Sequence, residues 1–135
     1  MPEIGALGLS MGRYTFEEFL QYASENGFDC IEISTSPGVH KNSMPMTFEN
    51  IPEIKELLAK YNLKPFAVSG YNDFVQKDTE ELARQIEKLE NTCKLAREVS
   101  AKVVRAFGGE VKEGINKKDT VKLIIEGFKE ATKRA

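Results

Sequence analysis

Short apolar segments and longer amphipathic segments follow one another along the chain. Four segments have the residue types and the two-residue alternation of strands: residues 4–10 (IGALGLS), 30–34 (CIEIS), 64–69 (KPFAVS) and 102–107 (KVVRAF). After each of them, apolar residues recur every three or four positions, as they do along one face of a helix. The pattern therefore predicts four successive strand–helix units.

Start and stop signals delimit the predicted helices. Thr15 and Glu18 have the spacing of a capping box. Gly27 is expected to end the first helix in the left-handed backbone conformation. A loop over residues 35–46, which contains two prolines, separates the second strand from the second helix. Further helix starts are predicted at Asn50 with Glu53, at Asp78 with Glu81 and near Asp119, and Asn62 is expected to cap the end of the second helix.

Alternation divides each strand into two faces. One face is apolar and suits packing under helices; we assign to it Leu7, Leu9, Ile31, Ile33, Phe66, Val68, Val104 and Ala106. The opposite face collects the polar residues Ser10, Glu32, Ser34, Ser69 and Arg105.

A sheet with one polar face favours one fold class over another. An open doubly wound sheet, as in flavodoxin, is covered by helices on both faces, and its strands read as continuously hydrophobic. A barrel of parallel strands has instead a polar mouth at the carboxyl ends of its strands. We therefore predict an α/β fold of four βα units with parallel strands, half of a (β/α)8 TIM barrel, in one domain over residues 1–135.

Composition excludes several classes of protein. The net charge is −2, from 19 basic and 21 acidic residues, which gives no positive field to hold nucleic acid. No apolar run reaches the roughly 18–20 residues of a membrane span, and the N-terminus is not that of a secretory signal. Cys30 and Cys93 lack the spacing of a metal pair and are interpreted as buried thiols. These features predict a cytoplasmic protein.

Three motifs resemble those of one family. Residues 27–33 (GFDCIEI) are similar to the G-[FY]-D-x-[IV]-E-[ILV] signature at the second strand of xylose-isomerase-like TIM barrels. Residues 103–109 (VVRAFGG) resemble the fourth strand of that family, and residues 61–65 (YNLKP) its approach to strand three. The similarity covers the whole chain in register. The family includes sugar phosphate isomerases and epimerases, as well as an endonuclease branch that uses additional histidine ligands, and the single histidine of this chain disfavours that branch.

The resemblance implies that this chain is an N-terminal half. Family members hold a divalent metal (Mn, Mg, Co or Zn) with side chains of strands five to eight, whereas the predicted pattern ends after the fourth helix. We therefore expect a truncated chain that binds no metal alone, is inactive alone, and supplies one wall of the pocket for a small sugar.

Four residues are candidates for contact with substrate. Glu32 and Arg105 are expected to recognise a sugar hydroxyl or phosphate, or to form an internal ion pair that neutralises both charges. His40, in the loop after the second strand, is expected either to contact substrate or the edge of a metal site, or to be solvated. Ser69 ends the third strand in a polar, aromatic loop of the kind that lines sugar pockets.

A half-barrel also has two open edges. The first and fourth strands would each have a row of unpaired backbone groups, and the concave face would be partly uncovered. We therefore predict a homo-oligomer, a dimer in which strand four of one copy lies beside strand one of the other. The alternative to an enzyme half is a non-catalytic, self-associating half-barrel.

Overall fold

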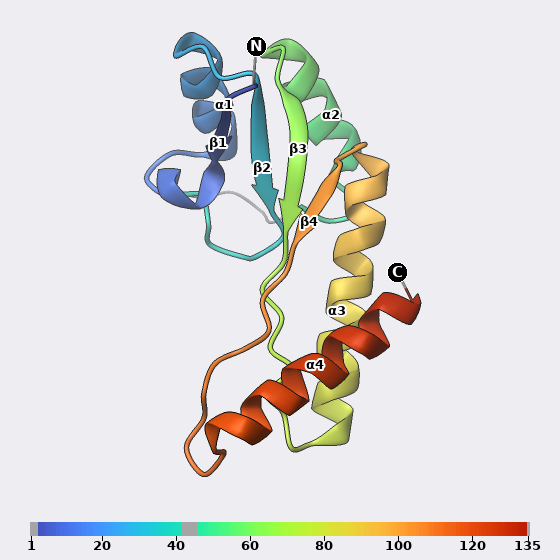
Figure 1. The fold of residues 1–135 in the computed structure, drawn as a ribbon. Coiled ribbons are helices and arrows are strands. Elements are labelled where there is room, and N and C mark those ends of the chain that lie inside the picture. The colour runs from blue at the N-terminus through green and yellow to red at the C-terminus, as the bar shows by residue number, and fades with distance from the viewer. Residues whose placement is uncertain (1–2, 42–45, 135) are drawn as a thin grey trace.

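The computed structural model describes residues 3–41 and 46–134, which contain one four-stranded parallel sheet in the order β1-β2-β3-β4 (Figure 1). The strands are β1 (Gly5–Leu7), β2 (Cys30–Ser34), β3 (Lys64–Ser69) and β4 (Val103–Arg105); the helices are α1 (Phe16–Glu25), α2 (Ile51–Lys60), α3 (Thr79–Glu98) and α4 (Lys117–Arg134). The predicted succession of four βα units is thus confirmed. Residues 42–45 of the predicted loop, and the chain ends 1–2 and 135, lie outside the described residues.

Helix α1 begins as its sequence predicts. The Thr15 hydroxyl accepts a hydrogen bond from the Glu18 amide at 3.2 Å, and the Thr15 amide donates to the Glu18 carboxylate at 2.7 Å. This reciprocal pair satisfies two amides that the first turn of a helix leaves without intrahelical partners. At the other end, Gly27 has a φ of 76°, the left-handed conformation expected of a helix stop.

The other helix starts agree with the sequence in part. Asp78 caps α3 by accepting from the Glu81 amide at 2.8 Å, as predicted. The box predicted at Asn50 is wrong, because the Asn50 side chain makes no cap to α2 and instead accepts from the Thr47 amide at 2.8 Å, which closes the turn before the helix. Helix α4 begins at Lys117, before the predicted start near Asp119.

Most of the core lies between the sheet and the helices α1, α2 and α3. The strand residues Ile31, Ile33 and Val68 are buried on this side, as the alternation predicts. The helix residues that cover them include Phe19, Leu20, Ile54, Leu58, Leu95 and Ala96. One face of the sheet is therefore packed under helices, and the other is free to form the concave side of a barrel.

A smaller core fixes α4, which crosses α3 obliquely in Figure 1. Its centre is Phe74, a fully buried residue of the loop after β3. The Phe128 ring of α4 meets the Phe74 ring edge-on, with 5.0 Å between centroids. Gly127 lies directly over Phe74, so closely that a Cβ at position 127 would overlap the ring. The absence of a side chain at Gly127 therefore sets how near α4 approaches.

The first strand is shorter than predicted, and its faces are the reverse of those expected. Strand β1 ends at Leu7, and Gly8–Met11 forms a 3-10 helix because the backbone of Gly8 turns tightly against the His40 ring. The register pairs Leu7 with Glu32 and Ala6 with Ile31. Ala6 thus packs toward the helices and Leu7 toward the concave side, the reversal that a one-residue change of register produces. Ser10, predicted on the concave face, is exposed in the 3-10 helix.

Phe66 also lies on the side opposite to the one predicted. The pairing of β2 with β3 shifts between Ile31 and Glu32, so that Phe66 is an extra residue in β3. Such a bulge breaks the strict alternation of faces. Phe66 is 44% exposed and lines the concave side next to Ala67, instead of packing under the helices.

The two cysteines, interpreted from the sequence as buried thiols, are far enough inside the protein for burial to affect both. Cys30 is buried and Cys93 half-buried, both are free thiols, and burial raises the pKa of each.

The helices of residues 3–41 and 46–134 include none with the length and apolar character needed to span a membrane.

We predict that Gly127→Ala destabilises the protein. Alanine favours a helix over glycine by about 1 kcal/mol, but its Cβ would collide with the buried Phe74 ring, and overpacking of this kind costs roughly 1–3 kcal/mol. The free energy of unfolding from urea titration should therefore fall. Glu126→Ala, at the exposed neighbouring position, is the matched control and should change stability by less than about 0.5 kcal/mol; a Gly127→Ala protein as stable as this control would contradict the proposed role of the glycine.

Candidate functional site

An ion pair crosses the concave face of the sheet. Arg105 at the end of β4 donates from Nε to both carboxylate oxygens of Glu32, at 3.1 and 3.0 Å, and from Nη2 to Oε1 at 2.6 Å. The Glu32 side chain is 17% exposed and that of Arg105 34%. The pair is therefore partly desolvated but still reaches solvent. Both residues lie on the polar face to which the sequence assigned them.

The register of β3 explains how side chains from β2 and β4 meet. β3 lies between these strands, with Ala67 beside Glu32 and Ser69 beside Arg105. Both intervening side chains are small, so the long arms of Glu32 and Arg105 can join above them. A larger residue at position 67 would stand between the two charges.

An aromatic pair supports the guanidinium from one side. Tyr71 and Phe107 are stacked, with ring centroids 4.6 Å apart and planes inclined by 13°. The Arg105 guanidinium carbon lies 4.9 Å from the centroid of Phe107 and 6.0 Å from that of Tyr71, within range of cation–π attraction. The hydrogen bonds that Arg105 donates to Glu32 are the main cause that raises the pKa of Arg105, with a smaller contribution from Tyr71. Arg105 therefore keeps its positive charge.

Asn72 holds this end of the site together, a role that the sequence analysis did not assign. Its side-chain amide donates to the Phe107 carbonyl, and its Oδ1 accepts from the Phe107 amide at 3.2 Å. Asn72 is 3% exposed. Its side chain thus pairs with the backbone of Phe107 as a neighbouring strand would, past the end of β4. Its position in the loop after β3 indicates an asparagine that forms a turn, but it does not predict the pairing with the backbone of Phe107.

The ion pair borders a hollow of about 680 Å³ on the concave face. Apolar side chains from all four strands surround the two charges, among them Leu7, Phe66 and Val103. Arg105 is the last residue of β4, whereas Glu32 is the middle residue of β2. Among the described residues, the lining of the hollow comes from the four strands, from Ala106 after β4 and from Glu3 before β1.

Ser69 lies at the same level of the sheet but is buried. It is 1% exposed, and its carbonyl accepts from the amide and the hydroxyl of Thr35, at 2.9 and 3.1 Å. Ser69 therefore joins the ends of β2 and β3, and it does not line the hollow beside Glu32 and Arg105.

His40 is placed away from the other three candidates, on the helix side of the sheet. Its ring stacks on Phe19 with 5.1 Å between centroids and meets Phe16 edge-on at 5.7 Å. It is only 8% exposed, so the interpretation as a solvated loop residue is wrong. Neither ring nitrogen reaches a hydrogen-bond partner among the described residues. Burial lowers the pKa of His40, and the nearby backbone of Met11 and Tyr14 opposes this only in part.

The described residues do not fit a metal centre. Over residues 3–41 and 46–134, no three side chains of His, Cys, Asp or Glu come together in an arrangement that could hold a metal ion. Two acidic residues line the concave hollow, and each is already engaged in an ion pair, Glu32 with Arg105 and Glu3 with Lys64. No metal-dependent chemical step can therefore be assigned to these residues.

Solved structures with the same arrangement define the fold class. The chain is similar to a 3-keto-D-glucoside 4-epimerase, YcjR, from E. coli (TM-score 0.73, 18% identity, 100% of this chain and 52% of that one). It is also similar to a D-allulose 3-epimerase from Methylomonas (0.73, 16%, 98% and 46%) and to the IOLI protein solved with a bound zinc atom (0.75, 17%, 99% and 48%). The chain spans about half the length of these structures. Its four βα units are half of a TIM barrel, as predicted.

One family model also matches most of the chain. The model of the xylose isomerase-like TIM barrel matches residues 20–135, and the chain belongs to this family. The resemblance of the three sequence motifs is thereby confirmed. No curated protein is similar enough to the sequence to count as a relative.

We predict that Arg105→Leu destabilises the protein because it leaves the Glu32 carboxylate without its partner. We expect a loss of about 1–3 kcal/mol, below the roughly 3–5 kcal/mol typical of a fully buried pair, because a third of Arg105 is exposed. Chemical denaturation measures the loss. The double variant Glu32→Leu with Arg105→Leu should recover most of it; equal loss in the single and double variants would show that the carboxylate is not the cause.

We predict that stability falls as the pH is lowered through the ordinary pKa of histidine, 6.5. Below this pH the histidine of the unfolded chain binds a proton, whereas burial disfavours protonation of His40 in the folded protein. The free energy of unfolding is therefore at its full value above pH 6.5 and falls by up to about 1.4 kcal/mol per pH unit below it. Unfolding titrations between about pH 5.5 and 7.5 measure the slope while most carboxylates stay ionised. The chain has one histidine, so His40→Phe should flatten the slope; an unchanged slope in that variant would assign it to other groups.

Proposed function

We propose that this chain forms one wall of the sugar-binding pocket of an isomerase- or epimerase-type barrel, with Glu32 and Arg105 as the residues that face the sugar. The observation that carries the proposal is the ion pair itself. It joins two strands across a concave face whose lining is largely apolar, and it borders the hollow. Active sites of TIM barrels lie at the carboxyl ends of the strands; Arg105 is the last residue of β4 and binds Glu32 at the middle of β2.

The chemistry of the pair supports a ligand rich in hydroxyl groups. Glu32 engages Nε and Nη2 of Arg105, which leaves Nη1 outside the ion pair. A guanidinium presents its donors in a fixed plane that suits hydroxyl, phosphate and carboxylate oxygens. Phe107, half-exposed beside it, offers an apolar ring to the C–H face of a sugar. Structural neighbours named as epimerases of a keto-glucoside and of D-allulose support the same class of substrate.

In this proposal Ser69 and His40 contribute to the wall from behind. Ser69 ties the carboxyl end of β3 to the segment after β2 through Thr35, and so fixes the strand that separates Glu32 from Arg105. His40 packs between the 3-10 helix and α1. Each keeps part of the pocket wall in place, and neither has enough exposed surface in this arrangement to bind a sugar on its own.

A metal ion belongs, in this proposal, to the other half of the barrel. The IOLI structure contains a zinc atom, and the donor set for Mn, Mg, Co or Zn would come from four further βα units. The alternative of a non-catalytic half-barrel is supported by one observation, the exposed apolar side chains of the concave face, including Phe66 and Val103.

We predict that ketohexoses perturb the concave face and not the helices. In ¹H–¹⁵N spectra, D-allulose or D-fructose at millimolar concentration should shift the Nε–H signal of Arg105 and the amides of Gly70 and Gly108, which follow β3 and β4. The signals of α2 and α3 should stay in place. Glycerol at the same concentration is the control for non-specific contact with hydroxyl groups.

The matched variant is Arg105→Lys, which keeps the charge and loses the planar set of donors. It should weaken the saturable shifts at Gly70 and Gly108. Mn²⁺ should not strengthen them, because the described residues offer no metal cluster. Shifts that are equal for sugar and glycerol, or that concentrate on the helices, would overturn the proposed pocket wall.

A further inference from the structure

The segments that follow β3 and β4, residues 70–78 and 106–116, stay paired beyond the ends of both strands. The Gly70 amide donates to the Arg105 carbonyl at 3.1 Å, and the Phe74 amide donates to the Gly108 carbonyl at 2.9 Å. Between these two bonds, the Asn72 side chain pairs with the backbone of the opposite segment. Figure 1 shows the two segments leaving the sheet side by side. At the strand rise of about 3.3 Å per residue, they extend the concave wall roughly 10 Å past the ion pair by Gly108.

Charged and polar contacts hold the far part of this wall extension. Lys112 Nζ lies 2.7 Å from Asp73 Oδ2, and Lys77 Nζ donates to the Gly114 carbonyl at 3.3 Å. Asp73 is itself fixed, because its backbone amide donates to the Gln85 side chain of α3 at 2.9 Å. The wall extension is therefore tied together across its two segments and to a helix of the main layer.

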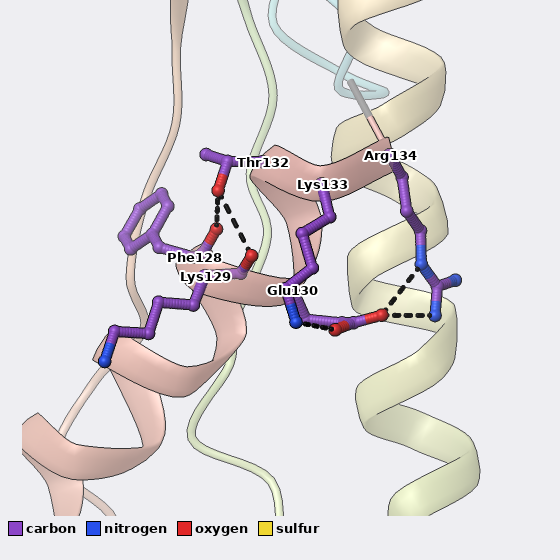
Figure 2. A network of polar contacts seen from close by, with 6 residues as sticks. All are labelled: Phe128, Lys129, Glu130, Thr132, Lys133 and Arg134. Carbon is purple, nitrogen blue, oxygen red and sulfur yellow. Dashed lines mark hydrogen bonds and ion pairs between the residues drawn. The ribbon is translucent and has the colours of Figure 1, made fainter.

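Helix α4 supports the wall extension from one side. A Cβ at Gly108 would lie 2.7 Å from the Ile124 side chain of α4, so the backbone of the extension lies directly on that helix. Figure 2 shows the turns of α4 that follow Phe128, where the Glu130 carboxylate accepts from Arg134 Nη2 at 3.1 Å. The helix thus continues past its contact with the loop after β3. With α4 on one side, the wall extension has its other side available for contacts.

A second hollow, of about 290 Å³, lies on the wall extension. Among the described residues, its lining and that of the hollow at the ion pair have no member in common. The two hollows adjoin at Phe107, which lines the second hollow and whose ring centroid lies 4.9 Å from the guanidinium carbon of Arg105 in the first. Small-molecule sites range from about 300 to 1,000 Å³, so the second hollow has room for about one ring.

The lining of the second hollow combines an aromatic surface with a polar rim. Tyr71 and Phe107 contribute their stacked rings, and Val111 adds an apolar side chain that is 68% exposed. Glu110 is exposed at the rim. An ion pair engages one of the three donors that the Lys112 ammonium carries. Such a surface suits a ring with apolar C–H faces and with hydroxyl groups at its edge, which is the character of a sugar.

The charges of the second hollow disfavour an anionic group. Asp73 and Glu110 bring two negative charges to its described lining, and Lys112 brings one positive charge, which gives a net charge of −1. The positive charge is already paired with Asp73. A phosphate ester would therefore meet like charge here, whereas a neutral sugar ring would not.

We propose that this wall takes a disaccharide, with a ketose at the ion pair of Glu32 and Arg105 and a second, neutral sugar ring against Phe107 and Val111. The position of the ketose rests on the proposed function; the position of the second ring rests on the second hollow. Linking the two rings makes the second contact intramolecular, so the disaccharide binds more tightly than either sugar alone. The substrate class is thereby a ketose joined to another sugar, and not a ketose phosphate.

Titrations of the whole chain, followed in ¹H–¹⁵N spectra, test this inference. The probes are D-fructose, lactulose (galactose linked to fructose) and D-fructose 6-phosphate. Lactulose should bind about tenfold more tightly than D-fructose, and it alone should add saturable shifts at the amides of Gly109, Val111 and Lys112. An equimolar mixture of D-fructose and D-galactose should not reproduce the gain, because its two rings are not linked.

The matched variants are Val111→Glu and Val121→Glu. Both replace an exposed valine, but Val111 lines the second hollow and Val121 lies on α4. Val111→Glu places a charge where the second ring would pack, so it should remove most of the difference between the dissociation constants for lactulose and D-fructose. Val121→Glu should keep that difference.

The outcomes separate this inference from the proposed function. D-fructose binding at Gly70 and Gly108 with no gain for lactulose would overturn the inference and leave the proposed function standing. An equal gain for D-fructose 6-phosphate, or a lactulose gain that Val111→Glu leaves intact, would also overturn the inference. Lactulose shifts at Gly109 and Lys112 without any at Gly70 would contradict the proposed function and keep the second sugar site. No saturable shift with any sugar would contradict both.

Discussion

Packing on one side of the sheet is the constraint on which the rest of this structure depends. Ile31, Ile33 and Val68 bury their side chains against three helices, and this commits the intervening residues of the same strands to the opposite face. No helix among the described residues covers the hollow on that face. The concave face therefore carries small residues, an ion pair and exposed apolar groups. The candidate functional residues lie on this face.

The Glu32–Arg105 pair reconciles two demands on that surface. A charge on a concave, largely apolar face is costly unless it is matched, and the pair matches both charges over the small side chains of β3. At the same time Arg105 retains donors outside the pair and an aromatic support beneath it. The internal ion pair and the recognition group of the proposed function are one feature. Under that proposal, removing either charge would affect stability and ligand binding together.

The sequence predicts what depends on local pattern. The order of the elements, the caps at Thr15 and Asp78 and the common face of Glu32 and Arg105 all follow from periodicity and spacing. Features set by contacts between distant segments were not predictable in this way. The bulge at Phe66 depends on the pairing of β2 with β3, the early end of β1 on the His40 ring against Gly8, and the burial of His40 on two phenylalanines of α1. In each case the deciding neighbour is remote in the sequence.

The close approach of α4 to Phe74 links two segments that would otherwise behave independently. Phe74 belongs to the loop after β3, and it receives Gly127 and Phe128 of the last helix in a small core separate from the main one. Because a local unfolding unit is defined by the contacts it shares, this loop and α4 form one such unit, while α1 and α2 belong to another. Opening of the last helix would release the Phe74 loop, and with it the Asn72 side chain that holds the backbone of Phe107. The contacts of a helix far along the chain therefore also help to hold the aromatic support of Arg105 in place.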